Sequence, residues 1–327
     1  MAITVHDFET LTDDLQSIFN ETSRNKVSEM VGATIFEVMD TDRRTFDHLV
    51  IHGLGKPQRV TPGGDLPKVN TNEGDSISWT QKYYGNSFEV NKEMRKFDLY
   101  DTIRALPKTL AESAFDTIDQ SYADALLNGW STSYTDVYDE TVASVGPDGL
   151  ALFSTVHTNN VNSNTYRNQI KNSSATENPT FARDAIVQAR VDASQHKDPE
   201  GNKRSIMLDT IVVPMALEDL AERTLYSTQL SNSANNDINP LKGKIKKIVT
   251  WSRLDEDSDS NDRSAYWFMY DSRLVNETLK SKFAERPTLD APDEAYLSKN
   301  WQYTLDFFYT IGLGYQAYVW GSKGTNS

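Results

Sequence analysis

Apolar side chains recur at helical spacing in two stretches of the chain. Over residues 7–20 they return every three or four positions, which predicts a short amphipathic helix with Phe8, Leu11, Leu15, Ile18 and Phe19 on one face. Residues 101–129 show the same spacing over a longer stretch. Proline fits the first turn of a helix but not its interior, so we expect this helix to begin near Pro107. Ending at Gly129, it would be roughly 33 Å long, which suits a structural strut.

Residues 52–76 break this periodicity. They contain five glycines and three prolines, and such a density of chain-breaking residues predicts an extended excursion rather than a packed element. Residues 77–84 and, after Gly85, residues 86–90 are rich in β-branched and aromatic side chains, which predicts strands. We therefore expect a long two-stranded arm that leaves the body of the protein and returns to it.

The rest of the chain alternates irregularly between helical and strand patterns. Residues 130–180 are rich in loop-forming residues, and helices are predicted over residues 180–193, capped near Thr180, and 215–227. Short apolar runs predict strands over residues 209–214, 246–251, 265–270, 301–308 and 314–320. Because strands and helices are interspersed without a βαβ rhythm, the sequence predicts the α+β class.

Composition narrows the class of protein. The chain has 327 residues, of which 38% are hydrophobic and 24% charged, as in a globular protein of one large or two ordinary domains. It contains no cysteine, which excludes disulfides, thiolate zinc sites, iron–sulfur clusters and a cysteine nucleophile. No apolar run reaches the roughly 18–20 residues that span a bilayer, and the N-terminus lacks a secretory pattern. We expect a soluble protein, without a membrane partner, that stays where it is made.

The net charge of −14 comes from 33 basic and 47 acidic residues. A protein that reads nucleic acid normally has a basic excess, because neutralising phosphates supplies most of its affinity. The one basic cluster consists of Lys242, Lys244, Lys246 and Lys247. Since no aromatic residues are interleaved with it, this cluster favours a solvated strand or an ion-paired subunit contact over a nucleic-acid patch.

The sequence has no Walker-type loop, no Gly-x-Gly-x-x-Gly fingerprint and no His-Glu-x-x-His. His157 would be a general base only with a positioned partner that the sequence does not reveal, and a packing or hydrogen-bonding role is favoured for it. His48 and His52 have the spacing of two helix-borne ligands but adjoin the glycine- and proline-rich stretch, so we expect no metal site there. Gly312 and Gly314, in an aromatic strand, indicate a bulge or close strand packing.

Residues 255–262 contain the candidate metal ligands of this sequence. Asp255, Asp257 and Asp259 occupy the first, third and fifth positions, as in a calcium-binding loop. However, Ser260 replaces the glycine of the sharp turn, and Tyr266 replaces the bidentate glutamate. Charged runs between strands usually face water, so we expect a solvated hairpin tip and no cofactor.

Four segments resemble, in their order and spacing, parts of tailed-bacteriophage major capsid proteins of the HK-97 type. Residues 85–94, GNSFEVNKEM, are similar to the strand that closes the family's extended loop and leads into its spine helix. Residues 148–159, DGLALFSTVHTN, resemble a stretch of Mu-like head subunits. Residues 210–221 are similar to a strand-to-helix step, and residues 239–254 with 266–271 resemble the asparagine–glycine link and the two strands that follow it.

This resemblance implies an HK-97-like capsid fold of the α+β class. It divides the chain into an N-terminal arm, an extended β-hairpin loop with adjoining strands, the spine helix of a peripheral domain, a mainly axial domain with interspersed peripheral strands, and C-terminal strands. These regions correspond, in that order, to residues 1–45, 46–90, 91–135, 136–300 and 301–327.

The resemblance also implies a function. The chain would be a structural subunit, without catalytic activity or cofactor, that self-assembles as hexamers and pentamers into the icosahedral head of a virion. The head would enclose double-stranded phage DNA without sequence-specific contact and would assemble in the host cytoplasm. Implied partners are other copies of the chain, a portal and, because the arm is short, a scaffolding protein in trans; decoration proteins are candidates. The alternatives are an encapsulin-type nanocompartment shell and a hydrolase that uses His157.

The residues expected to carry this function are contact residues in the arm and the loop. Ordering a long loop without core residues costs on the order of 1–2 kcal/mol per residue, which a neighbouring subunit's surface can offset. We therefore predict subunit contacts at Phe8, Leu11, Leu15, Lys56, Arg59, Lys68, Trp79, Tyr83 and Tyr84. Some proteins of this type crosslink loop lysines to asparagines of a neighbour, but nothing around Lys56 or Lys68 indicates such a bond.

Overall fold

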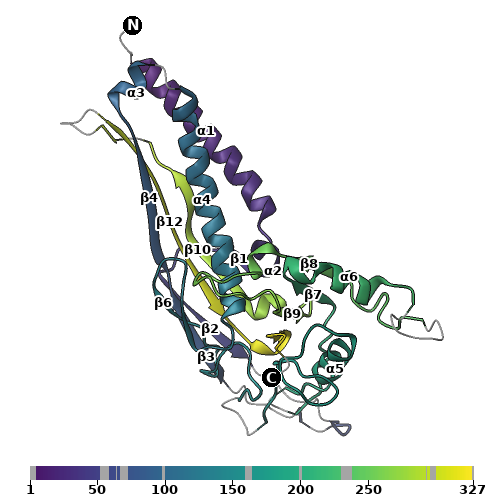
Figure 1. The fold of residues 1–327 in the computed structure, drawn as a ribbon. Coiled ribbons are helices and arrows are strands. Elements are labelled where there is room, and N and C mark those ends of the chain that lie inside the picture. Colours follow the sequence, from purple (N-terminus) through teal and green to yellow (C-terminus); the bar gives the residue numbers. More distant parts are fainter. Residues whose placement is uncertain are drawn as a thin grey trace.

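The computed structural model describes residues 5–51, 59–63, 65–66, 73–97, 100–158, 164–198, 201–229, 238–291, 293–294 and 300–325. Two long helices pack on a main sheet of five strands, and a second sheet of four strands carries two shorter helices (Figure 1). Strands and helices are interspersed along the chain. The predicted α+β class is confirmed.

Helices α1 (Val5–Glu29) and α4 (Tyr100–Leu127) lie side by side (Figure 1). Leu15 and Phe19 of α1 are buried in the core that α4 shares with the main sheet. Two ion pairs between the helices, with N–O distances of 3.3 Å and 3.2 Å, are Arg104–Asp14 and Lys26–Asp116. The described part of the N-terminal arm is therefore part of the chain's own body.

Both long helices extend further than the sequence predicted. α1 continues beyond residue 20 to Glu29 through a segment that is almost entirely polar, so the hydrophobic pattern could not mark its end. α4 begins at Tyr100 and has Pro107 inside it, so the predicted start near Pro107 is wrong. Ile103, one turn before Pro107, is fully buried. Its burial offsets the backbone hydrogen bond that proline cannot make and keeps these turns helical.

The main sheet is built around one long strand. It contains β1 (Glu37–Asp40), β10 (Leu279–Leu289), β12 (Trp301–Leu313), β11 (Asp293–Glu294) and β4 (Lys82–Val90). β12 runs antiparallel to β10, β11 and β4, and β1 adds to β10 in parallel. Alternate side chains point to opposite faces of a strand, and up to residue 309 the buried side chains of β12 are Trp301, Tyr303, Leu305, Phe307 and Tyr309. One face of the sheet therefore lies in the core, and the other is open except near Gly312, where Trp79 covers it.

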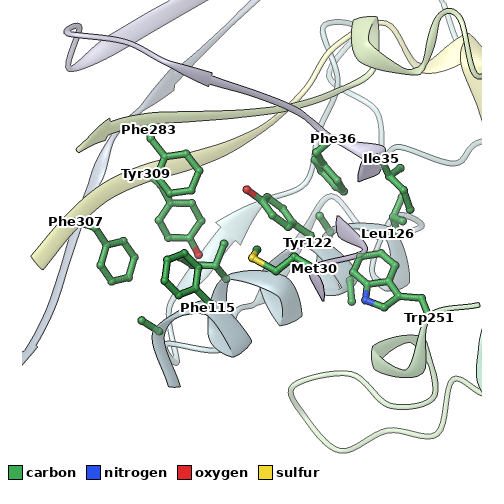
Figure 2. Close-up of a cluster of buried hydrophobic side chains, with 14 of the residues drawn as sticks. Met30, Ile35, Phe36, Phe115, Tyr122, Leu126, Trp251, Phe283, Phe307 and Tyr309 are labelled. Atoms are coloured by element: carbon green, nitrogen blue, oxygen red, sulfur yellow. The ribbon is translucent and has the colours of Figure 1, made fainter. Parts of the chain in front are cut away.

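The core fills the space between α4 and the buried face of the sheet (Figure 2). Tyr122 of α4 stacks on Phe36 with ring centroids 4.7 Å apart. From β12, the Tyr309 hydroxyl donates a hydrogen bond to Ser121 of α4 at 2.8 Å. Buried aromatic contacts thus fix the helix against the sheet, and the few polar atoms among them are hydrogen-bonded to each other.

β12 runs to Leu313 without the interruption that the sequence predicted after residue 308. Gly312 pairs with Lys280 of β10 in the regular ladder. A Cβ at Gly312 would lie 2.6 Å from two ring atoms of Trp79, so only glycine leaves room for this indole. The glycine marks close packing, as its place in an aromatic strand indicated.

The two-stranded arm consists of β2 (Thr45–Ile51) and β3 (Glu73–Thr80), which pair antiparallel. The sequence pattern placed both strands of the arm within residues 77–90, and this is wrong, because β4 pairs with β12 instead. The physical reason is aromatic burial: Phe88 stacks on Tyr303 with centroids 5.0 Å apart, and this draws β4 into the main sheet.

The second sheet has the strand order β13 (Val319–Ser322), β9 (Trp267–Tyr270), β7 (Thr210–Val213) and β8 (Lys247–Thr250). All residues of β7 and β9 are buried, and both strands lie where apolar runs predicted strands. β7 and β8 are parallel, and α6 (Glu218–Tyr226) connects them, so the chain contains one βαβ unit that the irregular pattern did not predict.

The second helix of this region, α5 (Arg183–Ser194), begins three residues after the predicted cap at Thr180. Phe181 lies edge-on to Trp267 with centroids 5.2 Å apart, and this buried contact holds the residues before α5 in an extended path. The remaining elements are α2 (Gly32–Ile35), α3 (Lys92–Lys96), β5 (Ser133–Thr135), β6 (Thr141–Ala143) and the 3-10 turns η1 (Met215–Leu217), η2 (Ser252–Leu254), η3 (Val275–Glu277) and η4 (Gln316–Tyr318). Within the described ranges, no helix has both the length and the apolar character needed to cross a membrane.

Replacing Leu15 with alanine tests whether α1 belongs to the folded body. Because this side chain is fully buried, Leu15→Ala is expected to lower the free energy of unfolding by about 2–5 kcal/mol. Val27→Ala, on the exposed side of α1, should change it by less than about 0.5 kcal/mol. Urea denaturation of unassembled subunits measures both, and equal effects of the two substitutions would contradict the packing of α1.

Candidate subunit-contact surfaces

The β2–β3 hairpin is anchored to the main sheet by an aromatic cluster at its root. Trp79 of β3 contacts Phe46 and His48 of β2, with ring centroids 4.7 Å and 5.9 Å apart. Its indole lies on Gly312 of β12. The direction in which the hairpin leaves the body is therefore set by a contact between Trp79 and a glycine. Trp79 is half-buried within its own chain, and its predicted contact with a neighbour stays a prediction.

His48 sits at this root on a strand, where it pairs with Ile77, so the helical ligand spacing that it shares with His52 does not apply. Burial, followed by the nearby positive charge of Lys280, lowers the pKa of His48. His52 lies outside the described residues. Among those that are described, no group of three or more His, Cys, Asp or Glu side chains is arranged to hold a metal ion.

The open face of the main sheet carries an exposed aromatic pair. Tyr83 of β4 is 60% exposed and packs on Phe308 of β12 with centroids 4.6 Å apart. Its hydroxyl donates to Asp306 Oδ2 at 3.3 Å. The positions around the pair include exposed Ser87, Gln302 and Thr304. An aromatic pair on an otherwise polar face is suited to contact with another protein surface.

Tyr84 points to the opposite face of β4, because successive side chains of a strand alternate. Its ring stacks on Tyr138 with centroids 4.0 Å apart and on Phe307 at 5.6 Å. Burial raises the pKa of Tyr84 well above its ordinary value. Tyr84 therefore packs within its own chain, and of the two adjacent tyrosines predicted as contact residues only Tyr83 lies on the open face.

The remaining predicted contact residues, in the N-terminal arm and in the extended loop, differ in their placement. Leu15 is fully buried in the chain's own core, which contradicts its prediction as a contact residue, because α1 folds back onto α4. Leu11 is partly buried against the same core. Arg59 is exposed. Lys56, Lys68 and the side chain of Phe8 lie outside what the structure describes.

The acidic loop is closed by its own hydrogen bonds. Asp257 is 5% exposed, and its carboxylate accepts bonds from Asn261 N at 2.9 Å and Arg263 Nε at 2.9 Å. Although burial alone would raise the pKa of Asp257, these hydrogen bonds lower it. Asp259 is exposed, and Asp255 Oδ1 accepts instead from Ala216 N at 3.5 Å. The three aspartates therefore do not converge on a cation site.

The sequence had suggested that this loop is a solvated hairpin tip, and this prediction is wrong. It joins β8 to β9, and these strands are not neighbours, because β7 lies between them. The parts that face water are Glu256 and residues 259–262. The chain crosses β7 at this point, and the buried carboxylate of Asp257 holds the crossing in a compact form.

Asp124, in the last turn of α4, ties this loop to the long helix. Its side chain is fully buried, and Oδ1 accepts hydrogen bonds from Ser258 N and Gln120 Nε2, each at 3.1 Å. Burial, helped by the nearby charge of Asp257, raises the pKa of Asp124 to about 6. The C-terminal end of a helix also disfavours a negative charge. The loop is thus docked on a carboxyl group whose ionisation is unfavourable.

His157 is fully buried, and both of its ring nitrogens are engaged. Nδ1 lies 2.7 Å from Asp148 Oδ2, and Nε2 lies 2.9 Å from Asn168 Oδ1. The Asn168 amide nitrogen in turn donates to the carbonyl of Leu152 at 2.6 Å. A general base must offer a lone pair to substrate, and neither nitrogen can do so in this arrangement. The geometry is that of the hydrogen-bonding histidine that the sequence favoured.

A cavity of about 510 Å³ lies between α5 and residues 164–171. Its charged lining includes Lys171, whose ammonium is 3.6 Å from Asp192, and Arg167, which forms an ion pair with Glu177. His196 borders it, and burial lowers the pKa of this histidine to about 4, which keeps it neutral near pH 7. These charged side chains are paired with one another, so the cavity is a gap between two segments of the chain and not a preformed ligand site.

The sequence reasoning missed Phe308. This residue shares a face with Gln302, Thr304 and Asp306 in a strand of period two, so strict alternation could have identified it as an outward-facing aromatic. Its neighbour across the ladder, Tyr83, is 225 residues earlier in the chain, and no local pattern could have paired the two.

A sequence model of the family described as "Phage capsid protein" matches residues 76–321, from β3 to β13. No curated protein has a sequence that matches this chain. Solved structures resemble this chain in fold. The capsid of Myoviridae phage XM1 has 10% sequence identity and a TM-score of 0.52, with 87% of this chain and 88% of that chain covered. The capsid of an empty GTA particle has 10% identity and a TM-score of 0.50, with 91% and 88% covered.

The packing of Trp79 on Gly312 can be measured by a double-mutant cycle. A methyl group at residue 312 would overlap the indole, so Gly312→Ala is expected to lower the free energy of unfolding by about 1–3 kcal/mol. In a chain that already carries Trp79→Ala, the same change should cost much less, because the indole that the methyl group would overlap is gone. Urea denaturation of the four proteins gives the coupling, and strictly additive effects would show that the two residues do not meet.

The buried Asp124 predicts a pH dependence of stability. Its folded pKa, about 6 against an ordinary 3.8, is raised, so the stabilisation is present below about pH 4 and is lost as pH rises through 6. Asp124→Asn removes this loss. The variant should be more stable than the parent protein at pH 7.5 by up to about 3 kcal/mol, and the difference should vanish near pH 4.

Urea denaturation between pH 4 and pH 8 measures this difference. Asp259→Asn, at an exposed position of the same loop, is the matched control and should show no such trend. A difference between Asp124→Asn and the parent protein that stays constant with pH would contradict the raised pKa.

Proposed function

The chain belongs to the phage capsid protein family, and from this premise we propose that its copies assemble as hexamers and pentamers into the icosahedral head of a tailed phage. It is a structural subunit of the virion shell with an HK-97-like fold. The observation that carries the proposal is that the family match extends from the root of the hairpin to the last strand of the second sheet. The resemblance to Mu-like heads stays a prediction.

The two sheets suggest how the shell is divided. We assign the main sheet with α1 and α4 to the peripheral domain and the second sheet with α5 and α6 to the axial domain. Within residues 136–300, we assign β10 and β11, which lie in the main sheet, to the interspersed peripheral strands. The β2–β3 hairpin would be the base of the extended loop that reaches a neighbouring subunit.

The proposed partners follow from charge and packing. A shell with a net charge of −14 per subunit repels packaged DNA, which fits containment without sequence-specific contact. The described part of α1 is packed on α4, so a scaffolding function is more simply supplied by a separate protein in trans. A portal and decoration proteins complete the proposed set, and we place assembly in the host cytoplasm.

The proposed role is non-catalytic. His157, the candidate base, is enclosed by Asp148, Asn168 and the stacked ring of Tyr166, with centroids 4.9 Å apart. This arrangement holds three segments together and presents no reactive atom to a substrate. An encapsulin-type shell remains the alternative to a phage head, since the two differ in their contents rather than their fold.

Assembly is tested by expressing the chain alone and with the scaffolding protein of the same phage, followed by sedimentation and negative-stain microscopy. Closed shells, capsomers or tubes are expected. Nuclease-protected DNA in particles from infected cells supports the head, whereas protein cargo supports the nanocompartment. Small monomers that persist even when the scaffolding protein is present would contradict the proposal.

The open face of the main sheet should contribute to this assembly. Tyr83→Ala with Phe308→Ala removes the exposed aromatic pair and is expected to lower the yield of particles by about tenfold or more, because such anchors dominate interface energies. Gln302→Ala, on the same face, is the matched control and should assemble normally. If both variants assemble like the parent protein, this face is not a contact surface.

A further inference from the structure

The βαβ unit of the second sheet separates charge between its two ends. β7 and β8 run in the same direction, and α6 returns between them. Lys246, just before β8, donates its backbone N–H to Asp209 O, just before β7. At the other end, Ala216, after β7, lies beside Asp255, after β8. The residues before the strands therefore gather at one end, and those after the strands gather at the other.

The acidic end, as we call it, combines carboxylates with exposed apolar side chains. Its acids are Asp219, which forms an ion pair with Arg223, Glu222 one turn further along α6, and Glu256 of the loop after η2, all exposed. Beside them, Met215 is 54% exposed and Leu220 is 38% exposed. Apolar side chains surrounded by charged ones are the usual composition of a contact surface between proteins.

The lysine end has the complementary composition. Lys242, Lys244, Lys246 and Lys247 are all exposed, and Ile238, in the same loop, is 79% exposed. Lys246 forms an ion pair with Asp209, and Lys242 donates to Thr228 Oγ1 at 2.8 Å. Lysine side chains also have aliphatic stems that can cover apolar surface while their ammonium groups stay paired.

Local stability explains only part of this arrangement. Acids near the first turn of a helix and cations near its last turn are favourable to its dipole, and α6 gains from both. The dipole gives no reason, however, for exposing Met215, Leu220 and Ile238. The first turn of α6, with Asp219, is also separated from the lysine end by roughly 13 Å, the length of the nine-residue α6. This exceeds the screening length of about 8 Å at physiological salt, so neither end neutralises the other.

We propose that the lysine end of one subunit docks onto the acidic end of the next copy of the chain. This inference rests on the proposed shell function and names one contact within it. The contact joins two different surfaces, so it repeats from subunit to subunit and generates a ring when the rotation closes. Opposite charges fix the register and speed the encounter, while the apolar side chains are removed from water.

Charge reversal tests the contact directly. Lys244→Glu with Lys247→Glu makes both ends acidic, and Glu222→Lys with Glu256→Lys makes both ends basic. Each pair of substitutions is expected to lower the yield of particles by about tenfold or more, through like-charge repulsion. The variant with all four substitutions restores opposite charges and should assemble to within about twofold of the parent protein. A mixture of the two double variants should form alternating even-numbered rings.

The control reverses two other exposed lysines, Lys92→Glu and Lys203→Glu, and should assemble normally although its net charge changes equally. Circular dichroism and thermal unfolding check that every variant is folded. If the parent protein assembles and the lysine-end variant does too, the contact is wrong while the shell function stands. The proposed contact is also wrong if the variant with all four substitutions does not recover assembly. If the parent protein itself never assembles, the proposed function fails first.

Discussion

The hydrogen bonds of the Asp119 carboxylate, in the C-terminal half of α4, are the interaction on which the arrangement of the molecule depends. Oδ1 accepts the backbone N–H of Gly32 at 2.9 Å, and Oδ2 accepts Trp251 Nε1 and Arg253 Nε, each at 3.0 Å. A buried carboxylate is tolerated only when its charge and lone pairs are satisfied. Here the three donors come from α2, from the end of the second sheet and from η2, so satisfying one charge brings these parts of the chain together on one helix.

Packing one turn later reinforces this junction. Tyr122 stacks on Phe36 (Figure 2), and its hydroxyl is 2.8 Å from Ser281 Oγ of β10. A Cβ at Gly32 would lie 2.4 Å from the Tyr122 ring, so the close approach of α2 to α4 requires glycine at this position. The hairpin, the open sheet face and the two charged ends lie outside this packed region and are the surfaces proposed for contact with other subunits.

Local pattern predicted the parts of the fold that depend on a single element. The periodicity of α4, the apolar runs of β7 and β9, and the close packing at Gly312 were readable because each is encoded by neighbouring residues. The order of capsid-like segments gave the family, which residues 76–321 confirm. The end of α1 was not readable, because a polar helix held by ion pairs has no hydrophobic stripe.

What the sequence could not give depends on partners far apart in the chain. Tyr84 and Phe88 look like arm residues until β12 supplies the aromatic face that they stack on. Leu15 has the spacing of a contact residue, and only the presence of α4 shows that it is internal. Asp119 carries no local signal at all, because its three donors lie 87 residues before it and more than 130 residues after it.

The most direct measurement is a cryo-electron microscopy reconstruction of particles assembled from the purified chain. The account predicts a closed shell in which every subunit keeps α1 on its own α4, with Asp119 between Gly32 and Trp251. It also predicts that contacts between subunits are made by the hairpin, by the open face around Tyr83, and by the two ends of the βαβ unit. A shell in which α1 packs on the α4 of a neighbour, or in which those surfaces all face solvent, would contradict it.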